Sequence, residues 1–100
     1  MTHYFKVSVS IVKESVTNPS DVEEQYMYVA QGHEYNIVAQ GNTVIEAKES
    51  FARTFDGQIA LDIFHEKKPL EDIGPLSHEE KLLYNIFEEE RYEYETMVEL

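Results

Sequence analysis

The sequence predicts an α+β fold: a three-stranded antiparallel meander packed by one long helix (β-β-β-α), followed by a short helix and a C-terminal strand. Two observations predict it. In the first 40 residues, apolar and polar side chains alternate with the period of two that is typical of half-buried strands. From residue 44 to residue 63, apolar residues instead recur every three or four positions, as on one face of a helix. One hundred residues without a repeat or linker indicate a single domain, with an acidic helix and tail from about residue 77.

Three consecutive segments have the pattern of strands: residues 3–14, 25–31 and 35–40. In the first, alternate residues place apolar side chains on one face: Phe5, Val7, Val9 and Ile11. The polar residues 15–24 contain an Asn-Pro-Ser-Asp turn sequence and form the loop before the second strand. Gly32 and His33 form a tight reversal before the third strand, for which we expect Gly32 to adopt a positive φ.

The long helix begins after Thr43, whose side chain is placed as an N-cap, with Glu46 three residues further on as in a capping box. Its expected buried stripe consists of Val44, Ala47, Phe51, Phe55, Ile59 and Ile63. An Asp-Gly pair at residues 56–57 leaves an alternative, in which the helix stops there and residues 58–64 form a strand. We favour the unbroken helix because the four-residue spacing continues through the pair, where a small residue would pack closely on the sheet.

The helix ends before Pro69, because proline disfavours the helical conformation of the residue before it. A loop over residues 69–75 follows, and Ser77 with Glu80 forms a second capping box. The short helix that begins there has an apolar face made of Leu82, Leu83, Ile86 and Phe87. Residues 91–100 alternate between tyrosine or aliphatic residues and glutamates, which favours a strand over a continued helix. That strand would complete a sheet edge or pair with another copy of the chain.

The net charge of −12, from 20 acidic and eight basic residues, is the strongest feature of the composition. Such a surface repels phosphate backbones and anionic lipids, so we expect no direct binding of nucleic acid or membrane. It attracts a basic protein partner over long range, and it also keeps a small protein soluble. The N-terminal residues lack the apolar core of a signal peptide, and no apolar run is long enough to span a bilayer. We therefore expect a cytoplasmic protein.

Residue types that carry catalysis or bind metals are not arranged for either. The chain has no cysteine, and its histidines (His3, His33, His65 and His78) occur singly, as surface or loop residues. The acidic pairs at residues 23–24 and 71–72 and the acidic run at residues 88–90 are typical of a solvated surface, and nothing places one of these carboxylates in an apolar pocket. There is no nucleophile motif and no phosphate-binding loop. The tyrosines favour packing on the sheet. We expect no enzyme, no cofactor and no metal site.

The segment Gly41-Asn42-Thr43-x-x-Glu46-Ala47, placed between strands and a long helix, resembles the HicB-like family. The resemblance covers about residues 6–69 and implies a β-β-β-α core related to the double-stranded-RNA-binding fold. It also implies an antitoxin that blocks a small basic ribonuclease toxin. The chain departs from the family in its polar insertion at residues 15–24 and in its acidic C-terminal part, which replaces the DNA-binding module of many members.

Three interpretations of function follow. The first is an antitoxin-like inhibitor that blocks a basic partner, either a ribonuclease toxin or another nucleic-acid-processing enzyme. The second is a phage-type nucleic-acid mimic or anti-defence inhibitor, and the third a non-enzymatic structural module that forms a homodimer through residues 92–100. The expected partner-binding residues lie in the acidic tail: Glu88, Glu89, Glu90, Tyr92, Glu93, Tyr94, Glu95 and Glu99.

Overall fold

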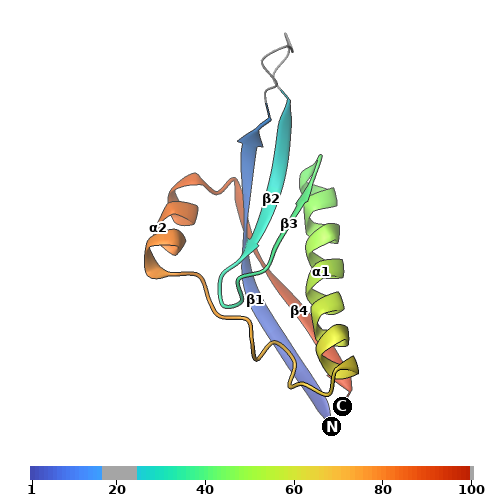
Figure 1. Cartoon of the computed structure of the whole chain (residues 1–100). Helices are drawn as coiled ribbons and strands as arrows, with labels where there is room; N and C mark the ends of the chain where they lie inside the picture. Colours follow the sequence, from blue (N-terminus) through green and yellow to red (C-terminus); the bar gives the residue numbers. More distant parts are fainter. Residues whose placement is uncertain (17–24, 100) are drawn as a thin grey trace.

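The computed structural model describes residues 1–16 and 25–99, and it has the predicted α+β architecture (Figure 1). Its elements, in chain order, are β1 (Thr2–Ser15), β2 (Tyr26–Gly32), β3 (Val38–Gly41), α1 (Val44–Phe64), α2 (His78–Phe87) and β4 (Glu90–Glu99). They follow in the predicted order. Residues 17–24, the main part of the expected polar loop, lie outside the described residues.

The four strands form one antiparallel sheet in the order β3-β2-β1-β4. β1 lies between β2 and β4, so that Val9 is opposite Gly32 on one side and Tyr92 on the other. Thr2 pairs with Glu99, and the first and last described strands therefore end side by side (Figure 1). The prediction that the acidic tail is a strand is confirmed, and this strand forms the sheet edge next to β1.

α1 lies across one face of the sheet and supplies the helical half of the core (Figure 1). The residues that it buries there, at a spacing of four, are Ala47, Phe51, Phe55 and Ile59. They pack against Val7, Val9 and Ile11, which alternate along the middle of β1. The predicted stripe is correct up to Ile59. Ile63 is 37% exposed, and Leu70 from the next segment joins the core cluster.

The start of α1 has the predicted cap. The Thr43 side chain accepts a hydrogen bond from the backbone N–H of Glu46 (3.1 Å), and the Glu46 carboxylate accepts one from the backbone N–H of Asn42 (2.9 Å). Gly41 is needed immediately before this cap. A Cβ on Gly41 would lie only 2.5 Å from the backbone nitrogen of Ala47, so the end of β3 can approach the first helical turn this closely only without a side chain.

α1 continues unbroken through Gly57, as predicted, but the role expected for this glycine was wrong. Gly57 is exposed, and a Cβ built on it would meet no atom within 4 Å. It therefore does not serve close packing on the sheet. The helix tolerates it because the buried residues on either side, Phe55 and Ile59, hold the helix on the core.

The third strand is shorter than predicted, because it begins at Val38 and not at residue 35. Two turn hydrogen bonds occupy the groups that a longer strand would need: Gly32 N–H donates to the Ile37 carbonyl (2.8 Å), and Ile37 N–H donates to the Tyr35 carbonyl (2.7 Å). Gly32 does not have the expected positive φ. It is required by close approach, since a Cβ there would lie 2.5 Å from the Tyr35 carbonyl oxygen.

The chain after α1 leads to α2, which lies on the opposite side of the sheet from α1 (Figure 1). Residues 69–75 form no helix or strand, in agreement with the predicted loop, yet Leu70 within it and Leu76 after it are each only 3% exposed. This segment is tied to the turn after β2, because Asn36 N–H donates to the Gly74 carbonyl (2.7 Å) and Leu76 N–H donates to the His33 carbonyl (2.9 Å).

Candidate functional site

The expected site residues on β4 divide between the two faces of the sheet. Tyr92 and Tyr94 are half-buried on the α1 side, whereas Glu93, Glu95 and Glu99 are exposed on the other side. This separation is the one that the alternating sequence predicts, because successive side chains of a strand point to opposite faces. The tyrosines therefore serve packing, and the carboxylates face solvent.

The exposed carboxylates of β4 form ion pairs with positive groups at the N-terminal part of the chain, next to β4 in the sheet. Lys6 of β1 places its ammonium 3.0 Å from Glu93 and 3.8 Å from Glu95. The hydrogen bond and the charge of Glu93 raise the pKa of Lys6. Glu99 lies 3.8 Å from the amino group of Met1 and accepts a hydrogen bond from the Thr2 hydroxyl. Cross-strand pairing thus partly neutralises this row of carboxylates.

The Glu88–Glu90 run does not extend the row, because its members point to different places. Glu88 is half-buried and forms an ion pair with Arg91 (3.1 Å). Glu89 donates its backbone N–H to the Ile11 carbonyl (2.7 Å), which starts the pairing of β4 with β1. Glu90 forms an ion pair with Lys48 of α1 (2.5 Å). The six glutamates that the sequence groups together therefore do not form one surface.

The two tyrosines of β4 fasten the strand beneath α1. The Tyr94 ring packs edge-on against Phe51 and Phe55, at centroid distances of 5.9 and 5.6 Å, and its hydroxyl donates to the Asp56 carboxylate (2.8 Å). Burial, together with Asp56, raises the pKa of Tyr94 to about 12. The hydroxyl of Tyr92 is buried and has no hydrogen-bond partner among the described residues, and burial raises its pKa to about 12.

A cluster of three polar side chains, which sequence analysis did not identify, joins three distant segments inside the molecule. The hydroxyl of Ser10 donates to the Glu88 carboxylate (2.6 Å) and lies 2.6 Å from Nε2 of His33. Ser10 is fully buried and His33 is 6% exposed, so His33 lies in a loop, as predicted, but not at the surface. Burial is the main effect that lowers the pKa of His33, and the positive charge of Arg91 lowers it further.

The order of these three groups differs from that of a nucleophilic triad. In a triad, the imidazole lies between the hydroxyl and the carboxylate, so that it can accept the hydroxyl proton. Here the Ser10 hydroxyl lies between His33 and Glu88, and it is shielded from solvent. The arrangement connects β1 to the turn before β4. No sequence signal indicated it, because Ser10 lies on the face of β1 opposite Val7, Val9 and Ile11, where the alternation predicts polar, exposed residues.

Asp62 is a second buried polar residue that sequence analysis did not identify. Its carboxylate accepts hydrogen bonds from the backbone N–H of Leu70 (2.8 Å) and from the Gln58 side chain (3.0 Å). These bonds hold the segment after α1, in which Leu70 has a positive φ of 64°. The carboxylate of Asp62 therefore has a structural role.

The predicted apolar face of α2 is exposed. Its members, with their exposed fractions, are Leu82 (48%), Leu83 (55%), Ile86 (72%) and Phe87 (67%). We call these four residues the α2 apolar face. Next to it, a groove of about 560 Å³ lies between α2 and β1, lined by Val12, Lys13, Glu14, Glu80, Leu83, Tyr84, Phe87 and Glu89.

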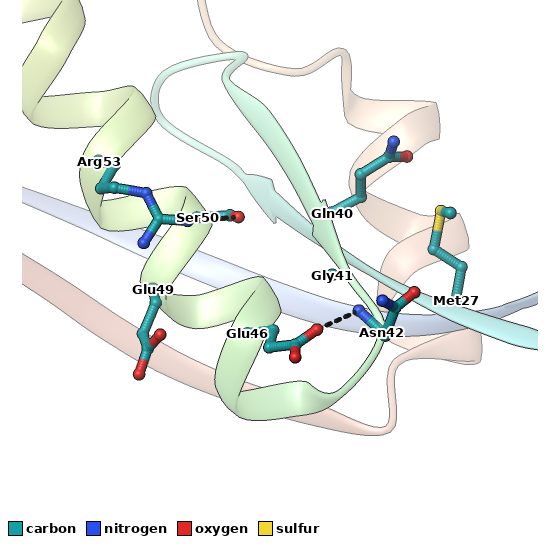
Figure 2. A pocket seen from close by; sticks show the side chains of 8 residues that line it. All are labelled: Met27, Gln40, Gly41, Asn42, Glu46, Glu49, Ser50 and Arg53. Atoms are coloured by element: carbon teal, nitrogen blue, oxygen red, sulfur yellow. Dashed lines mark hydrogen bonds between the residues drawn. The ribbon is translucent and has the colours of Figure 1, made fainter.

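A smaller, polar pocket of about 330 Å³ surrounds the Gly41–Ala47 motif. Figure 2 shows its lining residues: Met27, Gln40, Gly41, Asn42, Glu46, Glu49, Ser50 and Arg53. Two of its charged groups already have partners. The Glu46 carboxylate accepts from the Asn42 N–H, and the Arg53 guanidinium donates to the Ser50 hydroxyl (3.1 Å). The pocket is thus explained by the junction of strand and helix. Among residues 1–16 and 25–99, no group of three His, Asp or Glu side chains is placed to hold a metal ion.

Comparisons of the chain with family models, with curated proteins and with solved structures found no match. Within the described part of the chain, no helix combines the length and the apolar character that crossing a membrane requires.

Proposed function

We propose that this chain is a small, non-enzymatic, acidic protein that binds and inhibits a basic partner that handles nucleic acid. The inhibitor would act as an antitoxin does, by occupying the partner's surface. The observation that carries this proposal is that many of the Lys and Arg side chains are paired within the chain. Lys6, Lys48, Lys67 and Arg91, half of the eight Lys and Arg residues, form ion pairs with carboxylates of the same chain.

These ion pairs use the cations within the chain and leave its net charge of −12 unchanged, so the remaining carboxylates outnumber the remaining cations. Such a field accelerates encounter with a basic protein and discriminates against anionic ones. It also opposes binding to nucleic acid, because such binding requires Lys and Arg side chains that neutralise phosphates and displace their condensed counterions. These two effects together favour a protein partner of opposite charge.

The strand order and the strand–helix junction support an inhibitor that is HicB-like in its core. Three antiparallel strands precede α1, and the Gly41–Ala47 motif lies where β3 meets the helix. The region that departs from the resemblance is the C-terminal third, where α2 and β4 occupy the place of a DNA-binding module. A docking surface specific to this chain is most readily formed there.

The distribution of the tail carboxylates gives less support to a nucleic-acid mimic. A mimic needs an array of unpaired charges along one surface, whereas Glu90 faces Lys48, and Glu93 and Glu95 share Lys6. Exposed ion pairs of this kind contribute little stability, roughly 0–1 kcal/mol each, but they do reduce the local negative charge. The geometry is better suited to an inhibitor that combines apolar contacts with overall charge.

Capture of the partner tests this function. The tagged full-length chain is incubated with nuclease-treated lysate of its source cell, and the bound proteins are identified and purified. We expect a basic nuclease or another basic nucleic-acid-processing enzyme, whose activity falls when an equimolar amount of the chain is added. A captured ribonuclease toxin would identify the antitoxin-like form of the proposal.

Two results would contradict the proposed function. Recovery of the chain alone, as a dimer, would favour the oligomeric structural module. A captured enzyme that is released when Glu93, Glu95 and Glu99 are replaced by Gln, but not when apolar surface residues are replaced, would instead favour the mimic.

A further inference from the structure

We propose that the α2 apolar face, with the groove beside it, is the docking surface for an amphipathic basic segment of the partner. Such a segment carries large apolar side chains next to Lys or Arg residues. This inference rests on the proposed function, since it identifies the surface through which the basic partner is bound. It differs from the expectation that the partner binds the carboxylates of β4.

The α2 apolar face is not needed to hold α2 in place. None of the residues of α2 is buried. The helix is attached through its other side, where the Tyr84 hydroxyl donates to the Gln31 side chain (3.2 Å) and the Tyr84 ring lies 6.1 Å from the ring of His33. Leucine, isoleucine and phenylalanine side chains that are about half or more exposed and adjacent on one helix are typical of an interaction site.

The groove has the chemistry of a site for a basic segment. Leu83, Phe87 and Val12 line it with apolar side chains, and three exposed glutamates, Glu14, Glu80 and Glu89, line it as well. Lys13 also lines the groove, but its ammonium lies over the Tyr26 ring at 4.1 Å. Protein interfaces combine apolar contacts with polar and charged ones in this way.

The carboxylates of the groove decide between a basic partner and a second copy of the chain. A second copy docked on the same surface would bring its own three groove carboxylates close to these, and each protomer carries a net charge of −12. Like charges across an interface oppose association, whereas Lys and Arg beside an apolar anchor complement them. The favoured occupant is therefore the basic segment.

The surface is also preorganised for binding. Glu88, which follows α2 directly, is fixed by Ser10 and Arg91, and Leu76, just before α2, donates its N–H to the His33 carbonyl. Both ends of the helix are thus fastened to the sheet. Binding to a surface already in position avoids part of the ordering cost of association.

A defined peptide tests the docking surface directly. The probe is a synthetic helix of about 18 residues, or five turns, with Leu along one face and Lys along the other. Two matched peptides have Glu in place of Lys, or Ser in place of Leu. Binding to the ¹⁵N-labelled full-length chain is followed by NMR. We expect the Leu/Lys peptide to shift the amide signals of α2 and of Val12 and Glu14, and the two matched peptides to bind at least about tenfold more weakly.

The variant Ile86→Ser/Phe87→Ser removes the two most exposed members of the face without touching the core. It should weaken Leu/Lys binding by at least about tenfold, the effect of losing a central apolar contact. Ile45→Ser/Phe64→Ser is the matched control, because it removes an exposed isoleucine and phenylalanine from α1 (69% and 80% exposed), and it should bind as wild type does.

Three outcomes would overturn the docking surface. The peptide could shift residues around Glu93 and Glu95 instead, it could bind the α2 variant as tightly as wild type, or sedimentation could show a dimer that only the α2 variant abolishes. Failure here is distinguishable from failure of the proposed function. A captured basic partner that is retained by the α2 variant leaves the inhibitor intact and removes the docking surface, whereas absence of any basic partner removes the function itself.

Discussion

The hydroxyl of Ser10 lies 2.6 Å from Nε2 of His33, inside the molecule and 23 residues away along the chain. Its hydrogen is donated to Glu88, so the serine oxygen accepts from an Nε2–H of His33. Three segments are thereby joined: β1, the turn after β2 and the turn before β4. The region that carries α2 depends on this connection.

Replacing Ser10 by alanine should destabilise the protein by about 1–3 kcal/mol, because it leaves a buried imidazole N–H and a half-buried carboxylate without their shared partner. Urea unfolding followed by circular dichroism measures the change. Ser8→Ala is the matched control, since Ser8 lies on the same strand and faces the same side but is not fully buried. Equal effects of the two substitutions would contradict a role for the Ser10 hydrogen bonds.

Acidification should destabilise the native protein through His33. Burial lowers the pKa of His33 below its ordinary value of 6.5, with Arg91 and Lys81 acting in the same direction and Glu34 and Glu88 opposing them. The unfolded chain therefore binds a proton more readily than the native one. The stability that this neutral imidazole contributes is present above the unfolded pKa, and it is lost as the pH falls through the folded pKa.

His33→Gln tests this titration, because glutamine is neutral at every pH and retains an N–H donor. Between about pH 7.5 and pH 5, the free energy of unfolding of wild type should fall relative to that of His33→Gln. His78→Gln, at an exposed position, controls for the loss of an imidazole elsewhere in the chain. Wild-type and His33→Gln curves that run parallel over this range would be inconsistent with a buried, neutral His33.

Gly41, just before α1, and Gly57, within it, should respond to alanine in opposite directions. Gly57→Ala should stabilise the protein by about 1 kcal/mol, because it adds a better helix former where a Cβ meets nothing. Gly41→Ala should destabilise it, because its Cβ would lie 2.5 Å from the Ala47 nitrogen and force β3 away from the helix. Thermal unfolding measures both, and a stabilised Gly41→Ala would refute the close-approach explanation.

Removing the hydroxyl of Tyr92 should have little cost. The group is buried without a hydrogen-bond partner among the described residues, so Tyr92→Phe should leave stability unchanged or raise it by up to about 1 kcal/mol. Tyr94→Phe provides the comparison, because it loses the hydrogen bond to Asp56 and should be the less stable of the two variants. A larger loss for Tyr92→Phe would show that its hydroxyl has a partner after all.

Much of the candidate site lay beyond sequence analysis for one physical reason. Periodicity shows which side of an element is apolar, but not whether another element covers that side. The apolar stripes of α1 and α2 look alike in sequence, yet Phe51 is fully buried and Phe87 is 67% exposed. Likewise, the glutamates of the tail are close together in sequence, but they lie on two faces of the sheet. Glu93 pairs with Lys6 on one face, and Glu90 pairs with Lys48 of α1 on the other.

The sequence by itself determined the features that depend on neighbouring residues. The Thr43 cap and the alternation of β4 are set by interactions within a few positions of the chain. Only the tertiary structure decided the contacts that depend on strand register. The placing of Ser10 between His33 and Glu88, and the exposure of the α2 apolar face, follow from pairings between distant segments, which no local pattern encodes.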